Sequence, residues 1–194
     1  MAPTVRREHP FPRNEAYPRV AHEGSGLTLA GSTDIPRGMK YEPTFHVVLH
    51  QPEIPQNTGN IGRTCLAIGA KLWLVRPLGF SVEQRALRRA GLDYWKHLEW
   101  ETVSGWAELI DRLPEREPWY FSKKATRLYT DVSHQRGDIF VFGCETQGLP
   151  DSMLADNADR CLRMPIRDAV RSLNLGNAVA VAVYEAVRQV GLEA

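Results

Sequence analysis

Cysteine is scarce in this chain, and no spacing typical of a metal site is present. Of its 194 residues only Cys65, Cys144 and Cys161 are cysteines, with no C-x-x-C pair and no cysteine–histidine pattern of the zinc-binding kind. An odd and scattered set of this sort is typical of a reducing compartment. We therefore expect a cytoplasmic protein that has no structural metal.

Long apolar runs and a strong net charge are missing as well. No stretch approaches the roughly 20 apolar residues that span a membrane, and the basic N-terminus lacks the apolar core of a secretory signal. We therefore expect no membrane partner. Because the formal net charge is only +1, an argument for nucleic-acid binding has to come from local patches.

Two common nucleotide-binding motifs are also absent. The chain contains no G-x-G-x-x-G and no G-K-[ST], which argues against an α/β enzyme with a dinucleotide or a P-loop nucleotide, although that class stays open as an alternative. The string G-N-I-G at 59–62 matches the GXXG of KH domains, but four residues are too weak a signal to use.

Composition predicts one packed domain that is preceded by an extension. Hydrophobic residues make up 43% of the chain and charged residues 24%, as in ordinary globular proteins. Residues 1–43 differ, because they are rich in Pro, Gly, Arg and Glu and show no periodicity, so we interpret them as a flexible N-terminal extension. We favour a solvated tail over the alternative that the arginines of this extension contact RNA. The folded domain is expected at 44–194.

From Thr44 onward, strand-like and helix-like segments alternate. Strands are expected at 45–50, 71–76, 97–100, 119–122, 138–143 and 161–164, and helices at 57–68, 81–89, 104–113 and 150–156, with Ser104 as a cap of the third. A last helix runs from Asn174 or Asn177 to Gly191 and is apolar around most of its surface. Such alternation predicts an α/β fold, a mostly parallel sheet with helices on both faces.

Three loops stand out, because ligands of such sheets bind beyond the carboxyl ends of the strands. The first spans 52–65 and enters a helix with Arg63 near its start, where the helix dipole disfavours a cation. The second, F-G-C-E-T-Q-G-L-P at 142–150, allows a ligand to approach the backbone at Gly143. The third, 164–174, leaves a strand at a proline, so its backbone groups are available to bind an adenine.

Basic residues cluster beside aromatic residues in two places. Arg85, Arg88, Arg89 and Lys96 accompany Tyr94 and Trp95, and Lys123, Lys124 and Arg127 follow the fourth strand. Basic side chains interleaved with aromatic ones suit an RNA backbone and its bases. A solvated helix face explains the first cluster equally well.

Three ordered motifs resemble the SPOUT class of RNA 2′-O-methyltransferases. They are N-T-G-N-I-G-R-T-C, F-G-C-E-T-Q-G-L-P and M-P-I followed by R-S-L-N-L-G-N-A-V-A-V-A-V-Y-E. Together with Q-P-E-I-P-Q, P-L-G-F and R-R-A-G-L-D-Y-W, they are most similar to the tRNA (cytidine(34)-2′-O)-methyltransferase, or TrmL, family. The resemblance covers residues 44 to 191.

This resemblance implies a C-terminal trefoil knot, S-adenosylmethionine (AdoMet) as methyl donor without a metal, and a homodimer whose site is completed across the interface. The implied substrate is the anticodon stem-loop of tRNA, methylated on the ribose of wobble nucleotide 34, a cytidine or a modified uridine of leucine tRNAs. Arg63 and Asn57 match catalytic positions of the family. The implied cofactor-binding residues are Phe121, Gly143, Glu145, Met164, Ile166, Ser172, Leu173 and Asn174.

Departures from the family pattern leave alternatives open. Cys144 stands where relatives commonly have Pro, Gln147 where they have Arg, and Val170 and Gly176 where they have Ser. Loss of an arginine at 147 removes a phosphate contact, so another target remains an alternative: tRNA position 18 or 32, or ribosomal RNA. A non-catalytic knotted RNA-binding module is a further alternative.

Overall fold

The structure is a computed structural model and describes residues 42–81 and 93–192. These residues form one six-stranded sheet with the strand order β3-β2-β1-β5-β4-β6, in which every pairing is parallel. The strands are β1 (His46–His50), β2 (Lys71–Val75), β3 (Trp100–Val103), β4 (Trp119–Phe121), β5 (Ile139–Phe142) and β6 (Cys161–Leu162). The helices are α1 (Pro55–Ala67), η1 (Asp93–His97), α3 (Trp106–Arg112), α4 (Asp151–Asp156), η2 (Ala158–Arg160) and α5 (Leu175–Val190).

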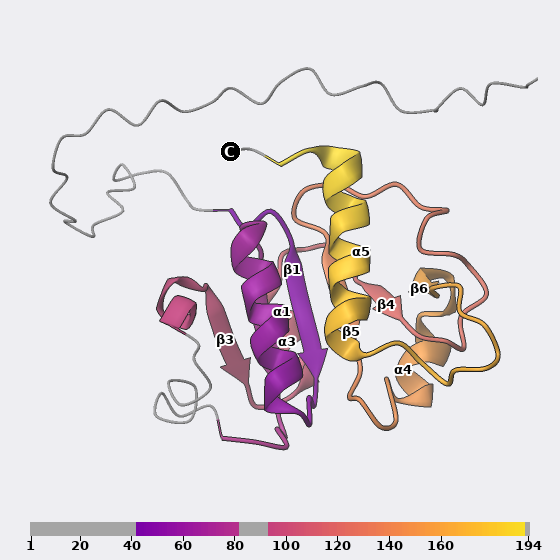
Figure 1. The fold of residues 1–194 in the computed structure, drawn as a ribbon, viewed down its shortest axis with the longest axis horizontal. Coiled ribbons are helices and arrows are strands. Elements are labelled where there is room, and N and C mark those ends of the chain that lie inside the picture. Colours follow the sequence, from indigo (N-terminus) through magenta and orange to yellow (C-terminus); the bar gives the residue numbers. More distant parts are fainter. Residues whose placement is uncertain (1–41, 82–92, 193–194) are drawn as a thin grey trace, which may run out of the picture. The chain divides into compact units, whose positions relative to one another are not determined.

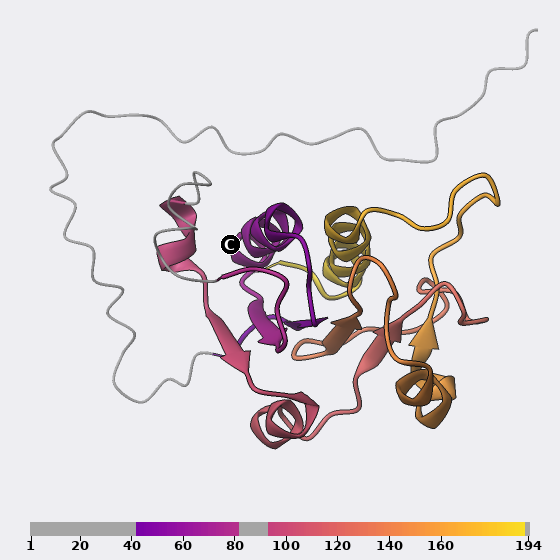
Figure 2. The ribbon, with the colours of Figure 1, turned by 90° about the horizontal axis from the view of Figure 1, so that it is seen from below.

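Helices cover both faces of the sheet, as the alternation predicts. Helices α1 and α5 lie side by side on one face, and α3 and α4 lie on the other (Figures 1 and 2). Successive side chains of a strand point to opposite faces, so each central strand supplies both cores. In β1, Val47 and Leu49 pack under α1 and α5, whereas Val48 packs on the side of α3.

The two helices α1 and α5 hold the larger core together. Val179, Ala182, Val183 and Ala186 form the buried stripe of α5, and their small size lets it pack closely beside α1. The expected boundaries of α5 are confirmed, because Asn174 caps its start and Gly191, with a φ of 76°, ends it. None of the helices in the described residues is long and apolar enough to cross a membrane.

Several boundaries differ from the sequence predictions. The strand expected at 97–100 is wrong, since a short 3₁₀ helix ends at His97 and β3 begins at Trp100. Ser104 does not cap α3, because the N-cap of this helix is Gly105. Instead, the N–H and the hydroxyl of Ser104 both donate to the carboxylate of Glu108. The helix expected at 81–89 and the basic residues Arg85, Arg88 and Arg89 fall almost wholly outside the described residues, as does the extension 1–43.

Helix α1 begins at Pro55 rather than at Asn57, and this changes the setting of Arg63. The proline suits a first helical position, because its missing N–H would have no partner there. Arg63 lies eight residues after Pro55, near the middle of a helix that ends at Ala67. The unfavourable interaction with the helix dipole that the sequence suggested is therefore absent, since that effect is confined to the first turn.

A buried histidine makes the stability of this fold depend on pH. His46 is almost fully buried, and Trp73 donates its indole N–H to His46 Nδ1 over 3.0 Å. Burial, together with the nearby Lys71 ammonium, lowers the pKa of His46 from 6.5 to about 4. A depressed histidine pKa means that the unfolded chain binds more protons between these two values, so stability falls as the pH drops from 6.5 towards 4.

We predict that His46→Asn weakens this pH dependence. Asparagine keeps an acceptor for Trp73 but does not titrate, so the wild type should lose about 2 kcal/mol more unfolding free energy than the variant between pH 7.5 and 5. Urea unfolding followed by circular dichroism at the two pH values measures this difference. Parallel losses in both proteins would contradict the assignment.

Candidate active site

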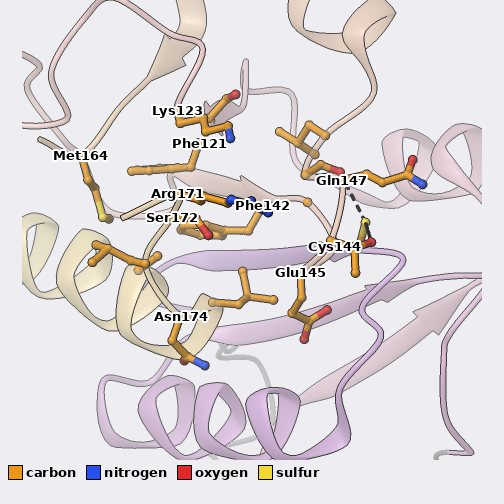
Figure 3. Close-up of a pocket in the computed structure, with 18 of the residues that line it drawn as sticks. Phe121, Lys123, Phe142, Cys144, Glu145, Gln147, Met164, Arg171, Ser172 and Asn174 are labelled. Atoms are coloured by element: carbon orange, nitrogen blue, oxygen red, sulfur yellow. Dashed lines mark hydrogen bonds between the residues drawn. The ribbon is translucent and has the colours of Figure 1, made fainter. Parts of the chain in front are cut away.

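A cleft of about 660 Å³ opens beyond the carboxyl ends of β4, β5 and β6. Its wall consists of the three segments that follow these strands, the last of which leads into α5, and of the first turn of α1 (Figure 3). Four segments that are far apart in sequence therefore meet at one site. This is the position at which open parallel sheets bind their ligands.

Nine of the ten candidate site residues line this cleft. They are Asn57, Phe121, Gly143, Glu145, Met164, Ile166, Ser172, Leu173 and Asn174. Arg63 is the exception, because it lies exposed on α1 and is not part of the cleft wall. The geometry thus gathers the candidate cofactor residues but separates the candidate catalytic arginine from them within one chain.

One wall of the cleft is apolar and aromatic. The rings of Phe121 and Phe142 stack with centroids 4.6 Å apart and an interplanar angle of 18°, and Leu162, Met164 and Ala178 also line the space. Figure 3 shows the side chains of Met164, Phe121 and Phe142 in this wall. Such a wall suits a flat apolar ring system, which gains from removal of its faces from water.

Backbone groups are available at the same wall. Within the described part of the chain, the N–H groups of Met164 and Ile166 donate to no other residue. Pro165, which lies between them, has no N–H, so the strand ladder stops at Arg163, whose N–H donates to Arg127. An edge of unpaired donors and acceptors beside an apolar wall is an arrangement that can recognise a nucleobase.

Glu145 joins the loop after β5 to the start of α1. Its carboxylate accepts from the N–H groups of Glu53 (2.8 Å) and Ile54 (3.2 Å) and from Asn57 Nδ2 (2.9 Å). Helix α1 has no side-chain cap of its own and no acidic residue in its first turn. Glu145 therefore supplies, from a distant part of the chain, the negative charge that the positive end of a helix favours.

Asn57 links Glu145 to the start of α5 through two hydrogen bonds. While its Nδ2 donates to Glu145, its Oδ1 accepts from Asn174 Nδ2 over 2.9 Å. Asn174 Oδ1 in turn accepts from the N–H groups of Gly176 (2.9 Å) and Asn177 (3.3 Å), which caps α5. Both ends of the Asn57 amide are thus occupied, so its observed role is to hold the two helix starts together.

A second carboxylate, that of Glu53 just before α1, binds the loop after β5. The side chain of Glu53 accepts from Thr146 N–H (3.1 Å) and from Thr146 Oγ1 (2.8 Å). Because Glu145 bonds to the backbone of Glu53 and Glu53 bonds to Thr146, the two loops are fastened at two adjacent points. A rigid wall of this kind keeps its hydrogen-bonding groups in place before a ligand arrives.

Gly143 also has a structural role within its own loop. A Cβ at this position would come within 2.0 Å of the carbonyl carbon of Gly148 and 2.2 Å of Leu149 N. The close approach is therefore to its own loop, which turns back sharply through Gly148 at a φ of 77°. Cys144 and Gly148 pair in an isolated antiparallel bridge there, and Gly143 still lines the cleft.

The described residues contain no metal-binding cluster, and two of the three cysteines are buried thiols. Between 42 and 81 and between 93 and 192, no group of three His, Cys, Asp or Glu side chains could hold a metal ion. Burial raises the pKa of the Cys65 thiol and, to a smaller extent, that of Cys161. Both are therefore poor nucleophiles at neutral pH.

Comparison with known proteins identifies the family. The model of the SpoU rRNA Methylase family matches residues 44–184, which is most of the chain. This chain belongs to the SpoU methylase family. The predicted membership of this class of RNA methyltransferases is confirmed, because the family model covers most of the chain.

Individual relatives are similar to this SpoU methylase over about three quarters of its length. The tRNA (cytidine(34)-2′-O)-methyltransferase of Saccharophagus degradans is 46% identical over 151 residues, which is 76% of this chain and 96% of that protein. A relative from Geobacillus stearothermophilus is 50% identical over 148 residues, 75% of this chain and 94% of its own. A solved structure described as giving insight into 2-OH methylation of C/U34 on tRNA is 44% identical, with a TM-score of 0.70, and covers 75% of this chain and 95% of its own.

Some residues at the cleft of this SpoU methylase could not be identified from the sequence motifs. Glu53, Phe142 and Ala178 were not singled out, although Glu53 fastens two loops and the other two line the cleft. Phe142 and Ala178 resemble ordinary core residues in sequence. Glu53 had a usable signal, because a lone acidic residue in Q-P-E-I-P has no basic neighbour to pair with.

We predict that Glu145→Ala destabilises the protein even without a ligand. The change leaves two backbone N–H groups and the Asn57 amide without their charged acceptor, which should cost about 2–3 kcal/mol of unfolding free energy. Urea unfolding of the ligand-free protein measures this loss. The control is Glu117→Ala, whose exposed carboxylate lies 3.7 Å from Arg160 and should contribute less than about 0.5 kcal/mol. Equal effects of the two changes would refute the capping role.

Proposed function

We propose that this chain is an AdoMet-dependent tRNA 2′-O-ribose methyltransferase that modifies wobble nucleotide 34, a cytidine or a modified uridine of leucine tRNAs. The observation that carries the proposal is the 46% identity to the Saccharophagus degradans enzyme of that name over 96% of its length. The structure related to methylation of C/U34 supports the same target. Membership of a methylase family supports the reaction type.

AdoMet is the proposed occupant of the cleft, and the residues present fit it. The stacked Phe121 and Phe142 and the free N–H groups of Met164 and Ile166 suit its adenine. When bound, AdoMet supplies an electrophilic methyl group. The chain's own contribution is to bind the adenine edge, to exclude water with the apolar wall, and to orient the acceptor ribose; positioning of this kind supplies much of the rate in group transfer.

Arg63 is proposed to act on the cleft of a second copy of the chain, in a homodimer. Its place outside the cleft wall supports this arrangement. Tyr184 and Val181 on α5 are 50% and 43% exposed, and Leu173 at the cleft is 40% exposed, so apolar surface adjoins the site. A contact between two copies across this surface would remove it from water.

The proposed chemical role of Arg63 is electrostatic. A guanidinium stays protonated at neutral pH, so it is a poor general base. It can lower the pKa of the ribose 2′-OH or orient a substrate phosphate through its planar set of donors. The proton of the 2′-OH would then pass to that phosphate or to water.

Basic side chains at the mouth of the cleft are proposed to bind the RNA backbone. Lys123, Lys124 and Arg171 line it (Figure 3 shows Lys123 and Arg171), and all three are exposed. Lys124 pairs with Asp151, whereas no acidic partner of Lys123 or Arg171 occurs among the described residues. These cations offer phosphate contacts beside Gln147, where the family usually has an arginine.

The finer architecture is also a proposal. The chain after β6 leaves from the edge of the sheet and returns to place α5 beside α1, two strands further in (Figure 1). This return path supports a trefoil knot in the C-terminal part. The domain is proposed to span 44–194, after an extension at 1–43, since the family model begins at residue 44.

We predict methyl transfer from labelled AdoMet to unmodified tRNA, with the product mapped by nuclease digestion and mass spectrometry. A 2′-O-methyl group on nucleotide 34 of leucine tRNA is the expected result. A methyl group at position 18 or 32, or on ribosomal RNA, would keep the reaction and refute the target. AdoMet binding without transfer to any RNA would instead support the non-catalytic module.

We predict that two strongly impaired variants restore activity when they are mixed. Arg63→Ala keeps the cleft but loses the arginine, while Met164→Trp fills the cleft and keeps the arginine. If Arg63 serves the partner's cleft, a mixed dimer contains one intact site, so up to about a quarter of wild-type activity should return. Co-refolded or co-expressed subunits, compared with each variant alone, provide the measurement. Persistent inactivity in a verified mixed dimer would place Arg63 and its cleft in one chain.

A further inference from the structure

The guanidinium of Arg63 rests on an aromatic ring rather than on an acidic partner. Its Cζ atom lies 4.8 Å from the centroid of the Tyr94 ring. In the described part of the chain, this ring is the one partner that Arg63 has. Arginine is a long side chain with many rotamers, so an exposed arginine that must act at a defined place needs such a restraint.

Tyr94 is itself fixed to the helix that carries Arg63. Its hydroxyl donates to the carbonyl of Gly59 in α1 over 2.6 Å. Gly59 lies four residues before Arg63, on the same face of the helix. The ring is thus held at one end by the α1 backbone, and its face is presented to the guanidinium one turn further along.

The segment that holds Tyr94 is packed tightly against α1. A Cβ on Gly62 would come within 2.4 Å of the Trp95 ring and 2.9 Å of Leu98, so only glycine allows this approach. Trp95 also packs against Trp100 with ring centroids 5.3 Å apart. The short helix η1 therefore packs on α1 in one defined position, and this packing also fixes the position of Tyr94.

We propose that Tyr94 is a positioning residue for Arg63, a role that rests on the catalytic function proposed for that arginine. A cation held over a ring face keeps all its N–H donors, which lie in the plane of the guanidinium. A carboxylate partner would occupy two of these donors and would repel a substrate phosphate. The ring restrains the arginine and leaves its donors for the phosphate or the ribose 2′-OH.

The first test compares Tyr94→Leu with Tyr94→Phe in steady-state methylation of tRNA. Leucine removes the ring and the hydroxyl, whereas phenylalanine keeps the ring face. We expect kcat to fall about tenfold in Tyr94→Leu and less than about threefold in Tyr94→Phe. The KM for AdoMet should stay unchanged in both, because Tyr94 does not line the cleft. Equal losses in the two variants, or a loss only in KM for AdoMet, would overturn the proposal.

A double-variant cycle separates positioning of Arg63 from damage to the fold. In an Arg63→Ala background, Tyr94→Leu should lower the residual rate no further, because the side chain that it positions is gone. Multiplying losses would show that Tyr94 acts independently of Arg63. If Arg63→Ala alone kept wild-type turnover, the proposed function of Arg63 would fail first, and this outcome is distinct from failure of the Tyr94 role.

Trp106→Leu provides a matched control for loss of a half-buried aromatic ring. Trp106 lies in α3, on the face of the sheet opposite α1 (Figure 2), and packs against Tyr120 with ring centroids 6.1 Å apart. This change should lower the melting temperature at least as much as Tyr94→Leu and leave kcat within about twofold of wild type. A tenfold loss of kcat in Trp106→Leu would attribute the effect of Tyr94→Leu to general destabilisation.

Discussion

The carboxylate of Glu145 at the start of α1 is the interaction on which the site depends. Helix α1 begins with an isoleucine cap and a proline, and its first turn has no acidic side chain. The donors that a helix leaves unpaired at its start must find acceptors. Here Glu145 accepts from the backbone of Glu53 and Ile54 and from Asn57. The N–H of the N-cap residue and the N–H just before it are thus paired with a loop about ninety residues further along the chain.

This contact turns separate loops into one wall of the cleft. Asn57 connects Glu145 to Asn174, which caps α5, and Glu53 returns a second pair of bonds to Thr146. The loop after β5, the start of α1 and the start of α5 therefore cannot move independently without breaking hydrogen bonds. The cleft between them keeps its shape, while the proposed catalytic Arg63 lies further along α1 and is restrained by a ring.

The α/β fold could be predicted from the sequence for physical reasons, whereas most of the cleft residues were implied by the family resemblance. Buried parallel strands such as 138–143 are continuous apolar runs, and the asparagine and glycine around α5 are strong boundary signals. Contacts between segments far apart in the chain could not be predicted from the sequence, above all the hydrogen bonds of Glu145 at the start of α1 and the link from Asn57 to Asn174. These depend on which loops meet in the folded chain, and no local pattern encodes that meeting.

Hydrogen exchange on addition of AdoMet tests the central claim most directly. If Glu145 couples the loop after β5 to α1, AdoMet should slow amide exchange at 143–149 and also at 53–57, as measured by mass spectrometry of short peptides. In Glu145→Ala at a saturating AdoMet concentration, protection should remain at 164–175 and disappear at 53–57. Protection of 53–57 that persists without the Glu145 carboxylate would contradict the account.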